Sequence, residues 1–233
     1  MKTTYYGQST FMLEAGGKKL LFDPFISPNP AAKDIDIHSL KPDYILVSHG
    51  HGDHVADLLD IQKSSGAKVI CIAEIAGWLG KHGVEDAHGM NIGGSWNFDF
   101  GTVKFTKAFH SSSYTTDDQE IIYTGMPSGI LFTAEGKTIY HAGDTSLFGD
   151  MALIGKRHPI DIAFLPIGDN FTMDINDAII CADMVKCNRI IGVHYDTFPA
   201  IKINRQEAID KFAKAGKELI LINIGDSVEM ETR

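Results

Sequence analysis

The 233-residue sequence contains only three cysteines, and no apolar run in it approaches the length of a membrane span. The cysteines at positions 71, 181 and 187 are odd in number, far apart and set in apolar surroundings, so we expect buried free thiols rather than a disulfide framework. The first ten residues also lack the apolar stretch of a signal peptide. These absences exclude disulfide-rich and membrane-spanning classes and predict a cytoplasmic protein.

Basic side chains are scarce beside acidic ones: 21 Lys and Arg face 30 Asp and Glu, which gives a net charge of -9. A field of this sign repels phosphate backbones, so the charge argues against a nucleic-acid partner. With 44% hydrophobic and 22% charged residues, the chain is ordinary in composition and not disordered. No linker or charge block divides it, so we expect one domain over residues 1–233.

Short apolar or alternating runs and stretches with helical spacing follow one another along the chain, which predicts a mixed α/β protein. The expected strands cover residues 19–22, 44–48, 68–72, 103–109, 130–133, 137–141, 162–167 and 189–193. The expected helices cover residues 55–63, 75–83, 176–187 and 205–215. The pair Gly16-Gly17 between two strand-like runs also predicts a hairpin turn.

The most specific feature is the segment His49-Gly50-His51-Gly52-Asp53-His54, directly after an expected strand. Imidazole and carboxylate groups are the ligands that Zn²⁺ and similar cations bind, so four candidate ligands occur in six positions. We interpret the two glycines as residues that let the backbone bend and turn alternate side chains inward. A solvated polar turn with a capping Asp53 is the alternative, but it leaves three clustered imidazoles unexplained.

Three further expected strands are each followed by a ligand-type residue, namely His110, Asp144 and His194. Strands of one sheet that end at the same edge bring their following loops together, so four remote segments can converge. Each of these residues alone has an ordinary explanation as a hydrogen-bonded histidine or a turn-forming aspartate. One turn cannot complete a binuclear site, however, and seven ligands suit two metals.

This ligand pattern resembles the metallo-β-lactamase superfamily over nearly the whole chain. The resemblance implies an α/β protein with a four-layer αββα sandwich and a binuclear site at one edge of two packed sheets. It also implies a role for each ligand: His49, His51 and His110 on the first metal, Asp53, His54 and His194 on the second, and Asp144 bridging both.

Three sequence segments around the ligands, at residues 21–25, 166–173 and 192–199, resemble those of the small stand-alone prokaryotic metal-dependent hydrolases. That group is similar to the ascorbate 6-phosphate lactonases. Asp23 resembles the aspartate that buttresses a ligand imidazole in this superfamily, although a turn residue before proline is the alternative. We expect His141 to be a structural histidine. Asp169 and Asn170 follow another strand and are expected near the site as supporting or substrate-contacting groups.

The polar segment 111–116 after His110 is expected to form a lid or substrate wall, or else a surface loop. The whole pattern predicts a hydrolase in which two divalent metals share a hydroxide and cleave a small ester, lactone or phosphoester, with Asp53 and Asp144 as catalytic carboxylates. Zinc is the first expectation, with manganese, iron or nickel as alternatives. The substrate class and the oligomeric state stay open.

Three other functions are alternatives to this one. A nuclease of the same superfamily would share the ligands, but the acidic balance and the lack of a basic insertion argue against it. A di-iron redox enzyme would need a flavin partner domain and a glutamate ligand, and neither is seen in the sequence. A non-catalytic metal-binding domain is the third alternative, which the complete ligand set argues against.

Overall fold

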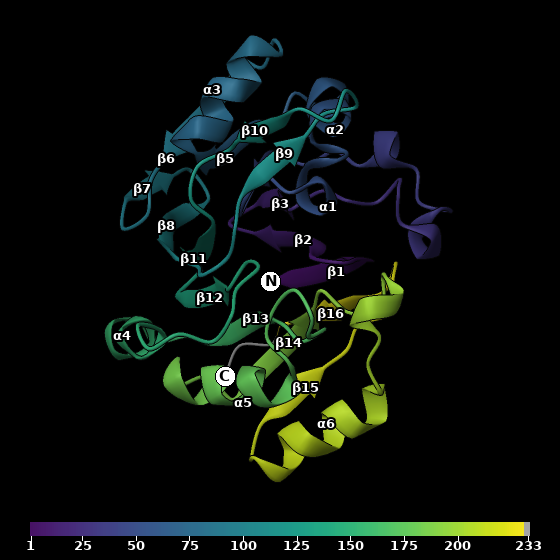
Figure 1. Ribbon diagram of the computed structural model, residues 1–233. Coiled ribbons are helices and arrows are strands. Elements are labelled where there is room, and N and C mark those ends of the chain that lie inside the picture. The colour runs from purple at the N-terminus through teal and green to yellow at the C-terminus, as the bar shows by residue number, and fades with distance from the viewer. Residues whose placement is uncertain (231–233) are drawn as a thin grey trace.

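Two seven-stranded sheets pack face to face, and helices cover the outer face of each sheet in this computed structural model (Figure 1). The structure describes residues 1–230. Three helices cover the first sheet, namely α1 (Gly52–Val55), α2 (Leu58–Ser65) and α3 (Ala73–Lys81). Three others cover the second sheet, namely α4 (Met151–Arg157), α5 (Ile175–Met184) and α6 (Arg205–Lys214). The expected four-layer αββα sandwich is therefore confirmed.

The first sheet is antiparallel at its β16 edge and parallel from β3 onward. Its strands in spatial order are β16 (Ser227–Glu229), β1 (Lys2–Gly7), β2 (Thr10–Ala15), β3 (Lys18–Phe22), β4 (Tyr44–Leu46), β5 (Lys68–Ile72) and β6 (Ala87–Met90). The hairpin between β2 and β3 turns at Gly16 and Gly17, whose φ angles of 60° and 73° suit residues without a side chain.

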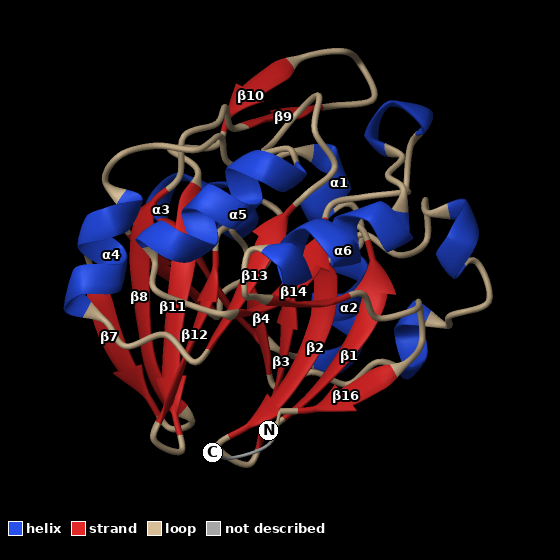
Figure 2. Ribbon diagram, turned by 90° about the horizontal axis from the view of Figure 1, so that it is seen from below, coloured by secondary structure: helices blue, strands red, loops and turns tan. Residues whose placement is uncertain are grey.

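The second sheet is parallel over four strands and antiparallel over the rest. Its strands in spatial order are β15 (Glu218–Ile220), β14 (Arg189–Val193), β13 (Ile162–Pro166), β12 (Lys137–His141), β11 (Ser128–Ala134), β8 (Gly101–Lys107) and β7 (Ser95–Phe98). A separate ribbon of β9 (Ser113–Thr115) and β10 (Ile121–Tyr123) lies at one end of the molecule (Figure 2). Short 3₁₀ turns occur at Pro30–Ala32, Ile37–Ser39 and Pro199–Ile201.

Alternate side chains of the central strands pack on opposite sides of each sheet, because both faces are covered. In β2, Phe11 and Leu13 lie in the core between the sheets, whereas Met12 packs toward the helices of the first sheet. The Phe11 ring stacks on Phe22 at 4.4 Å between centroids and on Phe164 of the second sheet at 4.0 Å. These rings join the two sheets beneath the edge where the candidate ligands lie.

The strands that precede the candidate ligands end at one edge of the sandwich. In the second sheet, β12 and β14 both run parallel to β13. Strand β8 has the same direction, because it is antiparallel to β11 and β11 is antiparallel to β12. The loops after these three strands carry Asp144, His194 and His110. They meet the segment that follows β4 of the first sheet, since Gly50 N donates a hydrogen bond to Ser112 Oγ at 3.2 Å and His54 Nε2 lies 3.2 Å from Asp144 Oδ2.

The expected helix over residues 55–63 is wrong in one respect, because the chain forms α1 and α2 with a break between them. At the break, Asp57 N donates to Pro24 O, and the Asp57 carboxylate accepts hydrogen bonds from Ile26 N and Ser27 N. These bonds hold the chain after β3 against the start of α2. The local pattern therefore indicated the helix but not the tertiary contact that interrupts it.

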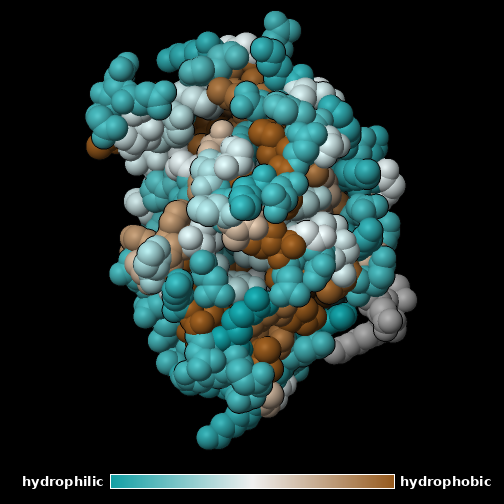
Figure 3. Space-filling view, turned by 90° about the vertical axis from the view of Figure 1, so that its right-hand side faces the viewer, coloured by the Kyte–Doolittle hydropathy of each residue, from teal (hydrophilic) through white to brown (hydrophobic). Residues whose placement is uncertain are grey.

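The face in Figure 3 is mostly hydrophilic, with apolar side chains showing in small areas between polar ones. Scattered apolar side chains of this kind are normal for a protein surface. Within residues 1–230, no helix is both long and apolar enough to cross a membrane.

Candidate metal centre

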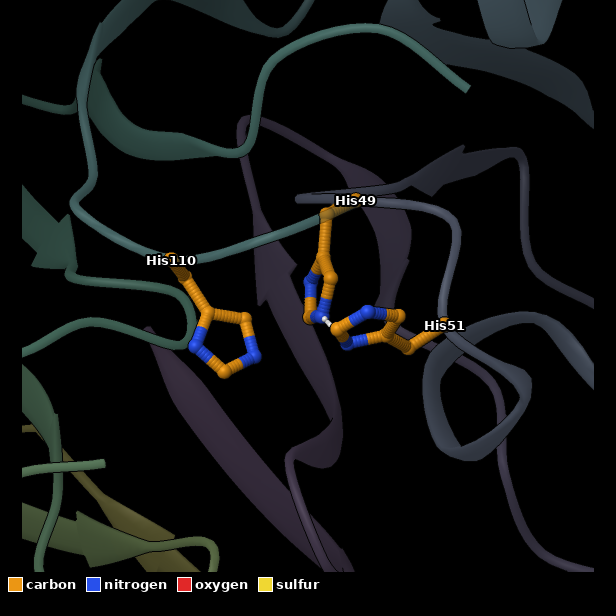
Figure 4. A group of neighbouring side chains, drawn as sticks. All are labelled: His49, His51 and His110. Carbon is orange, nitrogen blue, oxygen red and sulfur yellow. Dashed lines mark hydrogen bonds between the residues drawn. The ribbon is translucent and has the colours of Figure 1, made fainter. Parts of the chain in front are cut away.

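Three histidines form the first ligand group, and their side chains point toward one another (Figure 4). His49 and His51 come from the turn between β4 and α1, and His110 comes from the loop after β8. One ring nitrogen of each lies within 4.8 Å of the other two, and His49 Nε2 lies 2.9 Å from His51 Nδ1. His49 is fully buried, whereas His51 and His110 reach the surface of a cavity.

Four residues form the second group, namely Asp53, His54, Asp144 and His194, with donor atoms within 4.8 Å of one another. Asp144 Oδ2 lies 3.0 Å from His194 Nε2 and 3.2 Å from His54 Nε2. Asp53 Oδ2 lies 3.5 Å from His194 Nε2 and 3.6 Å from His54 Nε2. Asp53 and His54 lie in the short helix α1, and Asp144 and His194 lie in the loops after β12 and β14, all at the common edge of the sandwich.

Asp144 lies between the two groups. Its Oδ2 atom is 3.9 Å from His49 Nε2 and 3.7 Å from His110 Nε2, in addition to its contacts with the second group. One carboxylate oxygen therefore faces imidazole nitrogens of both groups. The structure brings together all seven residues that the sequence singled out, and their role as ligands stays a prediction.

The donor atoms fit divalent cations better than they fit hydrogen bonding among themselves. Atoms that share a tetrahedral cation at about 2.0–2.1 Å lie about 3.4 Å apart, which is close to the separations in the second group. Within the described part of the chain, the buried His54 Nε2 and Asp144 Oδ1 have no hydrogen-bond partner. Buried polar atoms without a partner are costly, and a cation would satisfy both.

The charges around the second group also favour a cation. Burial alone would lower the pKa of His194 and His54, but the carboxylates, Asp144 foremost, raise the pKa of His194 to about 9 and that of His54 well above its ordinary value. Burial would raise the pKa of Asp144, but His194 and His54 hold it well below its usual range. Burial, followed by the His54 charge, lowers the pKa of His49. Cation binding would thus displace protons from imidazoles that the carboxylates keep charged.

Behind the ligands, Asp23 is fully buried and links three side chains. Its Oδ2 atom lies 3.1 Å from His54 Nδ1 and 2.9 Å from His141 Nε2, and it accepts a hydrogen bond from Ser48 Oγ at 2.8 Å. Ser48 Oγ is also 3.0 Å from His49 Nδ1. Asp23 thus lies where a buttress for His54 is needed, and His141 is a buried histidine bonded to it.

Gln8, at the turn between β1 and β2, contacts the second group and was missed by the sequence analysis. Its Nε2 donates to Asp53 Oδ2 at 2.8 Å, and its main-chain oxygen accepts from His194 N at 2.8 Å and from Tyr5 Oη at 2.8 Å. Glutamine has no ligand signature, and 45 residues separate Gln8 from Asp53. Ser48 was missed for a different reason, because nothing but its position beside His49 indicates its role.

The ligand turn needs Gly50 for a reason other than the one expected. Neither Gly50 nor Gly52 is among the residues with positive φ, so the turn does not depend on left-handed backbone. A Cβ on Gly50 would lie 2.2 Å from Thr124 Oγ1, whereas a Cβ on Gly52 would meet nothing within 4 Å. Gly50 N also donates to Ser112 Oγ at 3.2 Å, and that oxygen is 2.8 Å from Thr124 Oγ1. Segment 111–116, expected to form a lid or substrate wall or else a surface loop, thus contains β9 and packs on the ligand turn through Ser112, while Ser111 reaches the cavity beside the ligands.

A cavity of about 650 Å³ opens beside the ligands. It is lined by His51, Asp53, His110, Ser111, Asp144, Phe171, His194, Phe198, Pro199 and Ala200. Asp169 and Asn170 are not among the lining residues, but the next residue, Phe171, is, so their expected role as supporting or substrate-contacting groups stays a prediction. Both are exposed and adopt left-handed φ angles of 62° and 53°, so they form the turn that leads to Phe171.

The chain belongs to the β-lactamase superfamily, because the model of the β-lactamase superfamily domain matches residues 18–195. It is 51% identical over 231 residues to the UPF0173 metal-dependent hydrolase of Shouchella clausii, which covers 99% of this chain and 100% of that protein. It is 54% identical over 209 residues to the UPF0173 metal-dependent hydrolase of Geobacillus thermodenitrificans, covering 90% and 92% of the two chains.

Among solved structures, the chain resembles Igni18, described as a novel metallo hydrolase from the hyperthermophilic archaeon Ignicoccus hospitalis. The TM-score is 0.89 at 34% sequence identity, and the match covers 100% of this chain and 99% of the other. The metallo-β-lactamase fold that the ligand pattern implied is therefore confirmed.

Proposed function

We propose that this protein is a binuclear metal-dependent hydrolase that cleaves a small ester, lactone or phosphoester. His49, His51 and His110 would hold one cation, Asp53, His54 and His194 the other, and Asp144 would contact both. Two divalent cations, zinc first among them, would supply Lewis acidity and a water molecule whose pKa is lowered toward about 7. The observation that carries the proposal is that Asp144 Oδ2 faces imidazole nitrogens of both groups within 3.9 Å.

The two carboxylates of the centre differ in exposure and hence in what they can do. The Asp144 side chain is 2% exposed, so it stays a fixed negative charge between the histidines. The Asp53 side chain is 25% exposed and lines the cavity, so it can accept a proton from a molecule there and return it. Gln8 fixes the Asp53 carboxylate by its hydrogen bond to Oδ2. We therefore assign proton transfer to Asp53. Asp144 has the role of a fixed negative charge between the histidines.

The proposal is tested by metal content and by turnover together. We expect the purified protein to hold two cations per chain by elemental analysis and to hydrolyse at least one ester, lactone or phosphoester in a substrate panel. Asp144→Ala is expected to reduce the metal content below one per chain and to abolish turnover, whereas His110→Ala is expected to weaken binding of one cation only.

His38→Ala is the matched control, because His38 is exposed and lies outside both ligand groups. It should retain both cations and full turnover. A single cation in the fully active protein would overturn the binuclear centre. A fully loaded protein that hydrolyses no member of the panel would instead support the metal-binding domain without catalysis, and tight salt-sensitive binding of RNA would favour the nuclease.

A further inference from the structure

We infer that the cavity beside the ligands accepts an uncharged ester or lactone with an apolar hydrocarbon body, an inference that rests on the proposed hydrolase function. The cavity lining is of two chemical kinds. It includes five of the candidate ligands and four apolar residues, Phe171, Phe198, Pro199 and Ala200, which we call the apolar side. A bound molecule therefore places its reacting group on the ligands and its remaining atoms on the apolar side.

The apolar side contains aromatic rings that remain open to solvent. Phe171 is 54% exposed although it belongs to the cavity lining. Phe198 reaches the cavity from another loop, and its ring centroid lies 6.1 Å from that of Phe25. An exposed aromatic ring in a concave site gains free energy when a hydrocarbon covers it, because apolar surface leaves water. The two rings thus form a binding surface for a hydrocarbon chain or ring.

The position of Phe171 is fixed by the backbone next to the candidate ligands. Asp169 and Asn170 adopt left-handed φ angles, and Asp169 N donates to Met173 O at 3.1 Å, which closes a tight turn. Met173 N donates in turn to Thr145 O at 3.1 Å, directly after Asp144. The turn is therefore attached to the loop that carries Asp144, and Phe171 is held at a set place beside it.

The lining offers little to a charged or hydroxyl-rich body. Among the described residues that line the cavity, none is Lys or Arg, and Ser111 is the one polar side chain outside the seven candidate ligands. Hydroxyl groups buried against phenylalanine and proline would lose their water partners without new hydrogen bonds, which is costly. A sugar-like or nucleotide-like body is therefore disfavoured, whatever its reacting group.

Two lactones with the same six-membered ring give a matched test on the metal-loaded protein. δ-Decalactone carries an apolar pentyl chain, whereas glucono-δ-lactone carries hydroxyl groups. We expect kcat/KM to be about tenfold or more higher for δ-decalactone, since each buried methylene contributes about 0.8 kcal/mol, or about fourfold. Equal or faster turnover of glucono-δ-lactone would overturn the inference.

Substitutions on the apolar side should act on KM for the apolar lactone. Phe171→Ala and Phe198→Ala are each expected to raise KM for δ-decalactone about 5- to 20-fold with little change in kcat, because the lost contact is remote from the reacting bond. Trp96→Ala is the control. The exposed fraction of Trp96, 56%, is close to that of Phe171, but Trp96 lies on the edge strand β7 and lines a different pocket. Unchanged KM in both phenylalanine variants would contradict the inference.

A binding measurement on the metal-free protein separates this inference from the proposed function. 2-Pentylcyclohexanone, an uncharged ketone with a six-membered ring and a pentyl chain, and myo-inositol serve as probes in calorimetric titrations. We expect the ketone to bind and inositol not to, with the ketone Kd raised about 5- to 20-fold in Phe171→Ala and unchanged in Trp96→Ala. Preferential binding of inositol, or a ketone Kd that is the same in Phe171→Ala, would overturn the apolar surface.

Failure of the hydrolase proposal and failure of the substrate inference give different results. If the metal-loaded protein turns over no ester, lactone or phosphoester while the ketone binds as expected, the hydrolase proposal fails and the apolar surface stands. If turnover occurs but favours glucono-δ-lactone, the hydrolase proposal stands and the substrate class is wrong.

Discussion

The imidazoles of the candidate centre are oriented by residues that stand outside the ligand motif. Asp23 and Ser48 contact the far side of His54 and His49, and Gln8 holds Asp53. A ligand imidazole binds a cation well only when its other nitrogen is held by a partner, which fixes the tautomer and the ring orientation. Replacing these partners should therefore change metal affinity without removing a ligand.

Asp23→Asn is expected to weaken zinc binding about 10- to 100-fold, as outer partners of ligand histidines typically do. The substitution removes the charge beside His54 Nδ1 and keeps the shape of the side chain. Asparagine also tolerates the positive φ of 43° at this position, so the substitution adds no backbone strain that would itself change the zinc affinity. Zinc competition with a chromophoric chelator measures the affinity. Asp118→Asn is the control, because Asp118 is exposed. An unchanged zinc affinity in Asp23→Asn would indicate that Asp23 is a turn residue without a role in metal binding.

Gln8→Ala is expected to weaken the cation held by the second group about tenfold, because Asp53 loses the hydrogen bond that fixes its carboxylate. The three histidines of the first group make no hydrogen bond to Gln8 in the described structure, so the other cation should bind as before. A two-site zinc titration separates the two affinities. Gln206→Ala on the surface of α6 is the control, and an equal loss at both sites would show that Gln8 acts on the whole fold instead.

The clustering of the candidate ligands could be predicted from sequence, because the segment that holds four of them and each of the other three follow strand-like runs, which is a local signal. Their supporting partners could not. Gln8 reaches Asp53 across 45 positions, and Asp23 reaches His141 across 118, so neither contact leaves a trace in local spacing. Asp169 and Asn170 follow a strand at the same edge, as expected, but the left-handed backbone of the turn that leads to Phe171 could not be predicted from the local pattern.

At the scale of elements, the β9–β10 ribbon packs on the ligand turn, and Gly50 marks the point of contact. Gly50→Ala is expected to destabilise the protein by about 1–3 kcal/mol, because the new Cβ would lie 2.2 Å from Thr124 Oγ1. Gly52→Ala is the matched control in the same turn, since its Cβ would meet nothing within 4 Å and its φ is not positive. Urea unfolding measures both. Equal stability of the two variants would contradict the packing account.

The buried central strands β3, β5, β8 and β11 to β14 were predictable, because sheets covered on both faces leave continuous apolar runs. The peripheral elements were not. Strand β7 has four residues and is mostly exposed, and β16 is a three-residue strand that pairs with β1 from the other end of the chain. Helix α4 has seven residues, too few for a clear helical period; Asp150 stands at its N-cap but makes no side-chain capping hydrogen bond, and no acidic residue lies in the first turn.

For the molecule as a whole, we expect the candidate centre to couple metal binding, proton binding and folding. The candidate ligands come from the segment after β4 and from the loops after β8, β12 and β14, so a cation that they hold only in the folded chain would stabilise the entire sandwich. We expect removal of metal by a chelator to lower Tm and added zinc to restore it. Thermal unfolding with and without chelator measures this, with His110→Ala expected to show a smaller shift. Identical Tm values in both conditions would contradict a centre that spans the loops.

The pH dependence of the metal-free protein follows from the charged imidazoles. In the folded state the pKa of His194 is raised to about 9 from an ordinary value of 6.5, so its stabilising interaction with Asp144 is fully present below pH 6.5 and is lost as the pH rises toward 9. Urea unfolding of the chelator-treated protein should therefore show stability falling over this range. With zinc bound, histidine protons have already been displaced, so stability should instead hold or rise as competition from protons fades. In the metal-free protein, His194→Gln should reduce the dependence of the unfolding free energy on pH. An unchanged dependence in that variant would show that another group causes it.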